Sequence, residues 1–297
     1  MNNKTSQLVM AMKGWDENLK TFSSPPQGLF GRKAIIRIGQ VTLNSDELDF
    51  EFTVSFDDDL EPNESEIIIY NLSDSTIQAI SYGASVVIEA GYGNDTGILF
   101  EGNIAKKKTK WETVDKVTTL NVIDHSSGTN AKISEKTYKA GSTASYILRD
   151  LWNYMGLPLV VFSPRRDHTY PDEVKVDGLL RDLIKQYAEV CGISVYVNNK
   201  RVYARHLSDG DNINFTIKTD TGLIDSPEEF EEEETAEDYT QIIRGYKIKM
   251  LLQHRMTTAA ICNLQSRNAS GTFRVRKGTH TFNESESITE VEAIYGG

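Results

Sequence analysis

Apolar and polar side chains alternate without a break in the stretch Leu48-Asp49-Phe50-Glu51-Phe52-Thr53-Val54-Ser55-Phe56. Successive side chains of an extended strand point to opposite faces, so this spacing puts the large apolar groups on one face and the polar groups on the other. The stretch predicts a β-strand that is buried on one side only.

Further strands are expected around this one, because runs of β-branched and aromatic residues are separated by turn residues. They are predicted at residues 34–38, 66–70, 85–90, 98–105 and 117–123. Between two of these runs, a cap at Ser73-Asp74 precedes Ile77 and Ile80, which have helical spacing. We therefore expect one short helix on a first β-barrel module that spans residues 33–123.

The pattern changes to helical spacing after this module. Ser142 or Thr143 can cap a helix that stops at Gly156, with apolar residues at Ala144, Ile147, Leu148, Leu151, Trp152 and Met155. A second helix is expected to stop at Gly192, with apolar residues at Leu180, Leu183, Ile184, Tyr187, Ala188 and Cys191. A hairpin around Asn198-Asn199 follows it. Residues 138–206 are thus predicted to form an inserted α/β domain.

Strand patterns return after the insert, at residues 240–252, 257–264, 271–276 and 288–295. We expect a second β-barrel module made of residues 124–137 and 207–297. Residues 1–32 are interpreted as an arm and a linker, because the consecutive prolines Pro25-Pro26 cannot continue a helix. The predicted fold class is mainly β with an α+β insert, in which a helix-helix-hairpin domain lies between two β modules.

The charge of the chain is concentrated in one segment. The 297 residues carry a formal net charge of −11, but nine acidic and no basic residues lie in 225–238, which leaves only −2 elsewhere. That balance disfavours a surface built to neutralise nucleic-acid phosphates. No apolar run reaches the ~18 residues of a transmembrane helix. We therefore expect no stable nucleic-acid binding and no membrane insertion.

Several groups of residues have the chemical types of a binding motif without its pattern. Gly91, Gly93 and Gly97 resemble a phosphate-binding loop, but a strand instead of a helix is expected after them. Asp57-Asp58-Asp59 lacks the twelve-residue loop of a calcium site. A hairpin turn and a solvated strand end are the alternative interpretations.

Candidate catalytic and metal-binding groups are equally weak. Asp124-His125-Ser126-Ser127 holds the residue types of a catalytic triad, but triad members are rarely neighbours in the chain. The five histidines form no His-x-x-x-His pair, and Cys191 and Cys262 lack the paired spacing of a zinc site. We expect no catalytic residue, no metal and no cofactor. A pair of carboxylates for glycoside hydrolysis stays open, because their separation is a three-dimensional quantity.

Two charged runs are the candidate interaction sites. Glu231, Glu232, Glu233 and Glu234 belong to an acidic run that repels itself, and it is expected to be a solvated loop, to line a channel, or to meet a basic patch on a partner. Lys106, Lys107 and Lys108 are the candidate basic counterpart. They are expected in a loop at a strand end, because no aromatic platform for single-stranded nucleic acid is interleaved with them.

The order of these segments resembles the baseplate or tail-tip hub proteins of tailed bacteriophages and phage-tail-like bacteriocins (tailocins). Three groups of residues carry the resemblance. The first is the module Ile67-Ile68-Ile69-Tyr70-Asn71-Leu72-Ser73, Ala90-Gly91-Tyr92 and Phe100-Glu101-Gly102-Asn103-Ile104. The second is the helix that opens at Gly141-Ser142-Thr143-Ala144 and ends before Gly156-Leu157-Pro158, and the third is Gly271-Thr272-Phe273-Arg274-Val275 with Gly278-Thr279-His280.

This resemblance implies a virion structural protein and not an enzyme. In the family, each subunit carries two β-barrel modules similar to the tail-tube protein, so a homotrimer presents six modules. Such a trimer is a tail-tube adaptor that resolves a symmetry mismatch between a sixfold tube and a threefold spike or tip. The partners implied are other copies of the chain, the tail tube protein, a spike or tail-tip protein and the C-terminus of a tape-measure protein.

The implied location is the baseplate or tail tip of a virion or phage-tail-like particle, with the bacterial host cytoplasm as the place of assembly. Two other functions stay open. A cell-wall-binding or cell-wall-degrading component of the tail is suggested by the compact α/β unit, since such modules can bind glycans. A tail component that contacts DNA is the third possibility.

Overall fold

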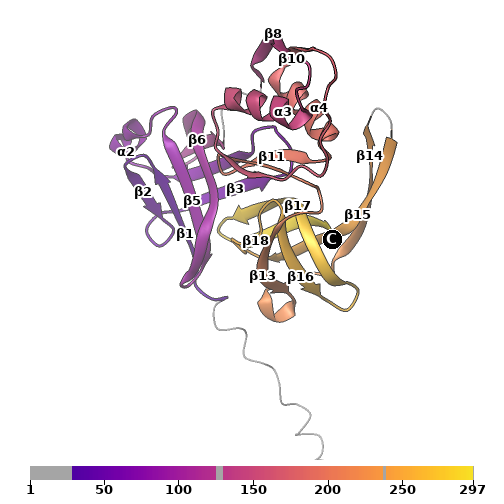
Figure 1. Ribbon diagram of the computed structural model, residues 1–297. Helices are drawn as coiled ribbons and strands as arrows, with labels where there is room; N and C mark the ends of the chain where they lie inside the picture. The colour runs from indigo at the N-terminus through magenta and orange to yellow at the C-terminus, as the bar shows by residue number, and fades with distance from the viewer. Residues whose placement is uncertain (1–28, 125–129, 237–238, 297) are drawn as a thin grey trace, which may run out of the picture.

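A computed structural model describes residues 29–124, 130–236 and 239–296, without the side chains of 234–241. Two β-rich modules lie side by side, and a small α/β domain sits above their junction (Figure 1). Of the predicted arm and linker at 1–32, only the last four residues fall inside the described ranges. No helix of the described part is long and apolar enough to cross a membrane.

The first module contains seven strands and one short helix. Their bounds are β1 (Arg32–Ile38), β2 (Val41–Asn44), β3 (Phe50–Phe56), β4 (Glu64–Tyr70), α2 (Asp74–Ala79), β5 (Ser85–Tyr92), β6 (Asp95–Glu112) and β7 (Asp115–Ile123). Ser73 caps α2 by accepting a hydrogen bond from the backbone N–H of Thr76 at 3.1 Å. Ile80, at the other end of this helix, is fully buried and fixes α2 on the module.

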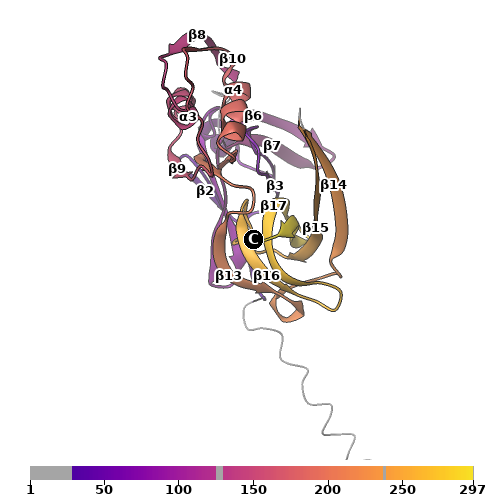
Figure 2. The same ribbon diagram turned by 45° about the vertical axis from the view of Figure 1, so that its right-hand side comes forward.

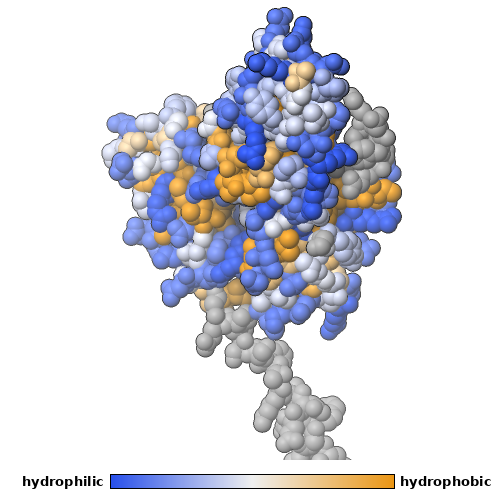
Figure 3. Space-filling view, in the orientation of Figure 1, coloured by the Kyte–Doolittle hydropathy of each residue, from blue (hydrophilic) through white to orange (hydrophobic). Residues whose placement is uncertain are grey.

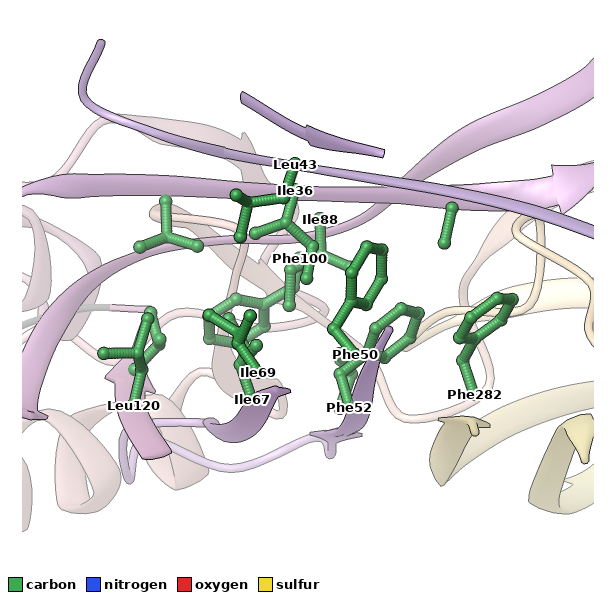
Figure 4. Close-up of a cluster of buried hydrophobic side chains, with 14 of the residues drawn as sticks. Ile36, Leu43, Phe50, Phe52, Ile67, Ile69, Ile88, Phe100, Leu120 and Phe282 are labelled. Atoms are coloured by element: carbon green, nitrogen blue, oxygen red, sulfur yellow. The ribbon is translucent and has the colours of Figure 1, made fainter. Parts of the chain in front are cut away.

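Strand β3 is the half-buried strand that the alternation of apolar and polar residues predicted. Phe50, Phe52, Val54 and Phe56 are buried, while Thr53 between them is exposed. Figure 4 shows Phe50 and Phe52 packed among isoleucine, leucine and phenylalanine side chains of the same module. Burying each such side chain contributes about 1.5–3 kcal/mol, which makes this cluster the main source of stability of the module.

The insert is a separate α/β unit with its own core. Its elements are β8 (Lys132–Tyr138), α3 (Ala144–Trp152), the 3-10 turn η2 (Asn153–Met155), β9 (Leu159–Phe162), β10 (Val174–Leu179), α4 (Leu180–Val190), β11 (Ser194–Asn198) and β12 (Arg201–Arg205). All six apolar residues predicted on each helix are buried. Thr143, and not Ser142, is the N-cap of α3, and Gly156 and Gly192 adopt left-handed φ angles of 68° and 66°.

Two details of the insert differ from the prediction. Residues 132–137 were expected in the second module, but β8 pairs with β10, and Ile133 and Tyr138 pack in the core of the insert. The turn of the β11–β12 hairpin lies one residue later than predicted, because Asn199 and Lys200 carry the positive φ angles of 48° and 61°. Such a pair of φ angles is typical of a type I′ hairpin turn.

The second module follows the insert. It contains β13 (Asp211–Ile217), the 3-10 turn η3 (Thr219–Thr221), β14 (Glu228–Ala236), β15 (Tyr239–Leu251), β16 (Ala260–Gln265), β17 (Ser270–Phe282) and β18 (Ser287–Tyr295). Its core includes Met250, Cys262, Phe273, Val275 and Ala293, all of which are at least 98% buried.

One hydrogen-bonded sheet continues through both modules. Its order is β14-β15-β18-β17-β3-β4-β7-β6-β5-β1-β2, and β16 and β13 extend from β17. The modules join where residues 278–282 of β17 pair antiparallel with residues 52–56 of β3. At this seam Phe282 of the second module stacks on Phe52 of the first, with ring centroids 5.3 Å apart (Figure 4).

The two modules repeat the same strand order. In the first module the sheet runs β3-β4-β7-β6-β5, and in the second it runs β14-β15-β18-β17-β16, with each strand at the corresponding place in the chain. The repeat ends at the next strand, because β1 pairs antiparallel with β5 whereas β13 pairs parallel with β16. The chain therefore carries two similar five-stranded units in sequence.

Candidate functional site: charged strand edges and the module junction

The acidic run is not a loop, which corrects the expectation for Glu231 to Glu234. It forms β14, which pairs along its length with β15, and Figures 1 and 2 both place this strand at the margin of the molecule. Glu231 accepts a hydrogen bond from Nε of Arg244 at 2.7 Å, and Glu232 lies 3.6 Å from Arg276. Pairing to β15 thus orders a segment whose charges oppose a compact structure.

The lysine run is also not in a loop at a strand end. Lys106, Lys107 and Lys108 lie inside the 18-residue strand β6, which continues to the tip of the β6–β7 hairpin. Lys107 donates to the carbonyls of Ile77 and Ile80 at 2.9 and 2.6 Å, at the C-terminal end of α2. A cation there stabilises the free carbonyls of the helix end, whereas Lys106 and Lys108 stay exposed.

The two candidate runs do not meet within one chain. Figure 1 shows β6 and β14 on opposite sides of the molecule. The face seen in Figure 3 is predominantly hydrophilic, and hydrophobic residues show around the junction between the insert and the modules. A contact between the acidic and basic runs therefore requires a second molecule.

A buried ion pair that the sequence did not predict lies at the junction. Arg274 on β17 has no exposed surface, and its Nη1 donates to Oδ2 of Asp58 at 3.0 Å. Its Nε donates to the carbonyl of Asp209, in the segment that follows the insert, at 2.9 Å. Nη2 is buried without a hydrogen-bond partner within the described ranges. The guanidinium thus ties β17 to the loop after β3 and to the end of the insert.

The three aspartates after β3 therefore have different environments. Asp58 is the partner of Arg274, and Arg276 also approaches it at 3.4 Å. Burial, reinforced by the nearby charge of Asp59, raises the pKa of the Asp57 carboxyl to about 6. The backbone carbonyl of Asp57 accepts a hydrogen bond from Thr258 of the second module at 2.9 Å. The prediction of a solvated strand end is wrong for Asp58 and Asp57.

A second polar contact joins the modules at the β5–β6 hairpin. Asp95 accepts hydrogen bonds from both terminal nitrogens of Arg255 at 2.8 and 2.6 Å, and Nε2 of His254 lies 3.0 Å from it. These hydrogen bonds, that of Arg255 first, lower the pKa of Asp95 to about 2. Gly97 leaves space for the His254 ring, since an added Cβ would lie 2.2 Å from its Nδ1. The glycine-rich segment is thus a hairpin turn at an interface, and not a phosphate loop.

The insert is fixed to both modules by amide side chains. Asn63 of the first module donates to Oδ2 of Asp124 at 2.9 Å and to the carbonyl of Val197 in the insert at 3.1 Å. Asn198, the next residue at the same end of β11, donates to Thr257 of the second module at 2.7 Å. The insert therefore bridges the same junction as Arg274.

Two cavities lie near these contacts, and the second of them reaches the seam between β3 and β17. One of about 540 Å³ is in the insert, and its lining includes Tyr146, Arg149, Asp150, Trp152 and Asn153. The other, of about 660 Å³, lies over β15, β17 and β18 and is lined by lysines and glutamates that are paired with one another, such as Lys277 and Glu292 at 3.0 Å. Neither cavity contains any of the seven residues named as interaction candidates.

The remaining candidates for chemistry are not gathered into a site. His125, Ser126 and Ser127 lie outside the described residues, and Asp124 at the end of β7 holds the side chain of Asn63. Burial lowers the pKa of His280 to about 3, so this imidazole is neutral and bonds Thr289 through Nδ1 at 2.8 Å. Among the residues that the structure describes, no group of three or more His, Cys, Asp or Glu side chains could hold a metal ion.

Comparison with known proteins gives matches in structure alone. No protein-family model matches the sequence, and no curated protein matches it either. The fold is similar to that of the tail protein from Neisseria meningitidis MC58, with a TM-score of 0.63, 9% identity, and coverage of 89% of this chain and 97% of that one. The 43 kDa tail protein of prophage MuSo2 from Shewanella oneidensis gives a TM-score of 0.65 at 5% identity, covering 89% and 98% of the two chains.

A third similar structure comes from a secretion system. The E. coli c3393 protein is described as a component of the type VI secretion system with structural similarity to the T4 bacteriophage tail proteins gp27 and gp5. It matches with a TM-score of 0.55 and 9% identity, over 88% of this chain and 76% of that one. The chain therefore has the fold of phage tail and baseplate-hub proteins, as the resemblance in its sequence predicted.

Proposed function

We propose that this chain is a non-enzymatic structural hub of a phage tail or phage-tail-like particle. It forms a homotrimer that docks on the tail tube and holds a spike or tip protein, with the C-terminus of a tape-measure protein as a further partner. The observation that carries the proposal is the repeat of five strands in the same order within one chain, β3-β4-β7-β6-β5 and β14-β15-β18-β17-β16. Three such chains present six similar units, which suits a sixfold tube above and a threefold partner below.

The tail-like fold of the similar structures supports the same role. On this proposal the protein resides in the baseplate or tail tip of the particle, after assembly in the host cytoplasm. The experiment is a mass measurement at virion-like concentration, alone and with the tube and spike proteins. A trimer in either condition is expected, and monomers under all conditions would refute the proposed hub.

A cell-wall-binding component is the second candidate, and the cavity of the insert favours it. This cavity of about 540 Å³ is lined by the exposed ring of Tyr146 and by the charged side chains of Arg149 and Asp150. Aromatic and charged groups of this kind can bind sugars or peptides. A peptidoglycan pull-down and a turnover assay separate the candidates, because a hub gives neither retention nor product.

A further inference from the structure

The two repeated units differ at one strand edge. Strand β17 pairs with β18 along one edge. Along its other edge it pairs twice, with β16 through residues 270–274 and with β3 through residues 278–282. Strand β6 pairs with β7 along one edge. Along its other edge, the first half of β6 pairs with β5, up to Asn103. In the described part of the chain, residues 108–112 of β6 have no strand on that edge.

The described part of the chain contains no strand that completes this edge of β6. In the repeat, β17 corresponds to β6, and its partner β3 corresponds to β14. The pair β17–β3 within the chain is therefore equivalent to a pair between β6 of one molecule and β14 of another. Strand β14 is free to make this pair, because within the described ranges it is hydrogen-bonded to β15 alone and ends the sheet.

The charges of the two edges are complementary. Strand β14 carries Glu228, Glu229 and Glu231 to Glu234 and no basic residue, whereas the second half of β6 carries Lys106, Lys107, Lys108 and Lys110. Two copies of β14 repel each other, and so do two copies of β6, which disfavours pairing of either edge with itself. A contact of the acidic edge with the basic edge is head-to-tail, and such contacts form a ring when the rotation between copies closes.

The matching charges also share a face of the continuous sheet. Residues that are directly paired lie on the same face of a sheet. One series of such pairs crosses the sheet from β6 to β15 and consists of Lys106, Asn121, Glu66, Thr53, Thr281, Ile288 and Leu251. Lys247 lies four residues before Leu251 on β15 and is paired with Glu228. Side chains two or four residues apart on a strand lie on the same face. Lys108 and Lys110 therefore share the face of Lys106, and Glu232 shares the same face through Glu228. Lys106 and Lys108 are exposed, and the side chain of Glu232 is 49% exposed.

Exposed apolar side chains accompany both edges. Trp111 and Val114 at the tip of the β6–β7 hairpin are 70% and 77% exposed, and Ile242 beside β14 is 49% exposed. Large apolar groups at a hairpin tip are costly to leave in water and are typical of contacts between proteins. A strand added to β6 covers the base of its hairpin.

The geometry points to a specific subunit contact: β14 of one copy adds to residues 108–112 of β6 in the next copy, with Glu232 opposite Lys108 and Lys110. This inference rests on the proposed homotrimer and identifies the surfaces that hold it. Each copy then contributes β14 to one neighbour and the edge of β6 to the other. The β6–β14 pair between copies repeats the β17–β3 pair between the modules.

The test is a pair of charge reversals with a rescue, followed by sedimentation of the full chain with the tube protein. Lys108→Glu with Lys110→Glu is expected to weaken trimer formation on the order of 100-fold, which is within the range of close charge pairs at interfaces. Adding Glu232→Lys, on the same face as Lys108 and Lys110, to the same chain is expected to restore most of it. Lys132→Glu with Lys139→Glu, on the exposed surface of the insert, changes the net charge equally and should leave assembly unchanged.

The outcomes separate this inference from the proposed function. Monomeric wild type refutes both the hub and the contact. A wild-type trimer that the Lys108/Lys110 variant forms equally well overturns the contact alone. Loss of the trimer without rescue by Glu232→Lys also overturns it, provided that thermal unfolding of the monomer shows that each variant is folded.

Discussion

Arg274 and Asp58 form a buried ion pair across 216 residues of sequence, with 3.0 Å between Nη1 and Oδ2. Neither side chain is more than 10% exposed. A charge in such a place costs several kcal/mol unless it is paired, so the contact requires both modules to be folded and docked. The pair therefore couples the loop after β3 to the second module.

Replacing Arg274 by methionine is expected to destabilise the chain by about 3 kcal/mol. Removing one partner of a buried pair typically costs about 3–5 kcal/mol, and the lower end applies because Arg276 stays beside Asp58. Urea denaturation measures the change. Arg267→Met on an exposed turn is the matched control and should stay within about 0.5 kcal/mol of wild type; equal losses in both variants would contradict the role of Arg274.

The raised pKa of Asp57 predicts a pH-dependent gain in stability for Asp57→Asn. The native carboxyl keeps its proton up to about pH 6, whereas the unfolded one loses it near its ordinary pKa of 3.8. Between these values the native state binds more protons, so wild-type stability falls as the pH rises through this window. The variant lacks this loss, and its advantage should grow by about 1 kcal/mol between pH 4 and pH 7, allowing for partial solvent screening.

Thermal unfolding of both chains across this pH range is the measurement. Asp46→Asn, on an exposed turn, is the control, and its difference from wild type should be constant. A constant difference for Asp57→Asn as well would show that Asp57 is ionised like a surface group.

Adding a methyl group at Gly278 should open the seam between the modules. An added Cβ would lie 2.5 Å from the carbonyl oxygen of Glu290 and 2.7 Å from the ring of Phe56. Such crowding forces backbone shifts that cost about 1–3 kcal/mol. Limited proteolysis should cleave Gly278→Ala faster than wild type, whereas Thr53→Ala, an exposed position on the same seam, should behave like wild type.

Replacing Phe52 by aspartate should prevent folding, because an unpaired carboxylate in this core costs several kcal/mol. Phe52 is 2% exposed and stacks on Phe282. Thr53→Asp introduces the same charge one residue later, on the exposed face, and should remain soluble. Size-exclusion chromatography of both variants is sufficient, and a soluble Phe52→Asp chain of wild-type yield would contradict the core assignment.

The predictable parts of the fold are those with a local pattern. The alternation of Phe50, Phe52 and Val54 gives β3, and helical spacing after Thr143 gives α3, with Gly156 at the end of the 3-10 turn η2 that follows it. These signals depend on neighbours in the chain, since the burial of each face follows a period of two or of 3.6 residues. They also gave the order β, α/β, β along the chain.

The parts that were missed depend on the pairing of strands and on contacts between the modules. Glutamates 231–234 have an unfavourable local charge, but pairing with β15 makes them a strand. Asp58 looks like a solvated residue until Arg274 is placed beside it. The candidate site was found as two charged runs, but their position on free strand edges follows only from the pairing of the whole sheet.

The seam between β17 and β3 has a mechanical consequence. Its five residue pairs run antiparallel along the two strands, so a force that slides one module past the other along the strand direction loads all of these hydrogen bonds at once. A force that peels the strands apart from one end would load them one after another. We expect the chain to resist sliding far better than peeling.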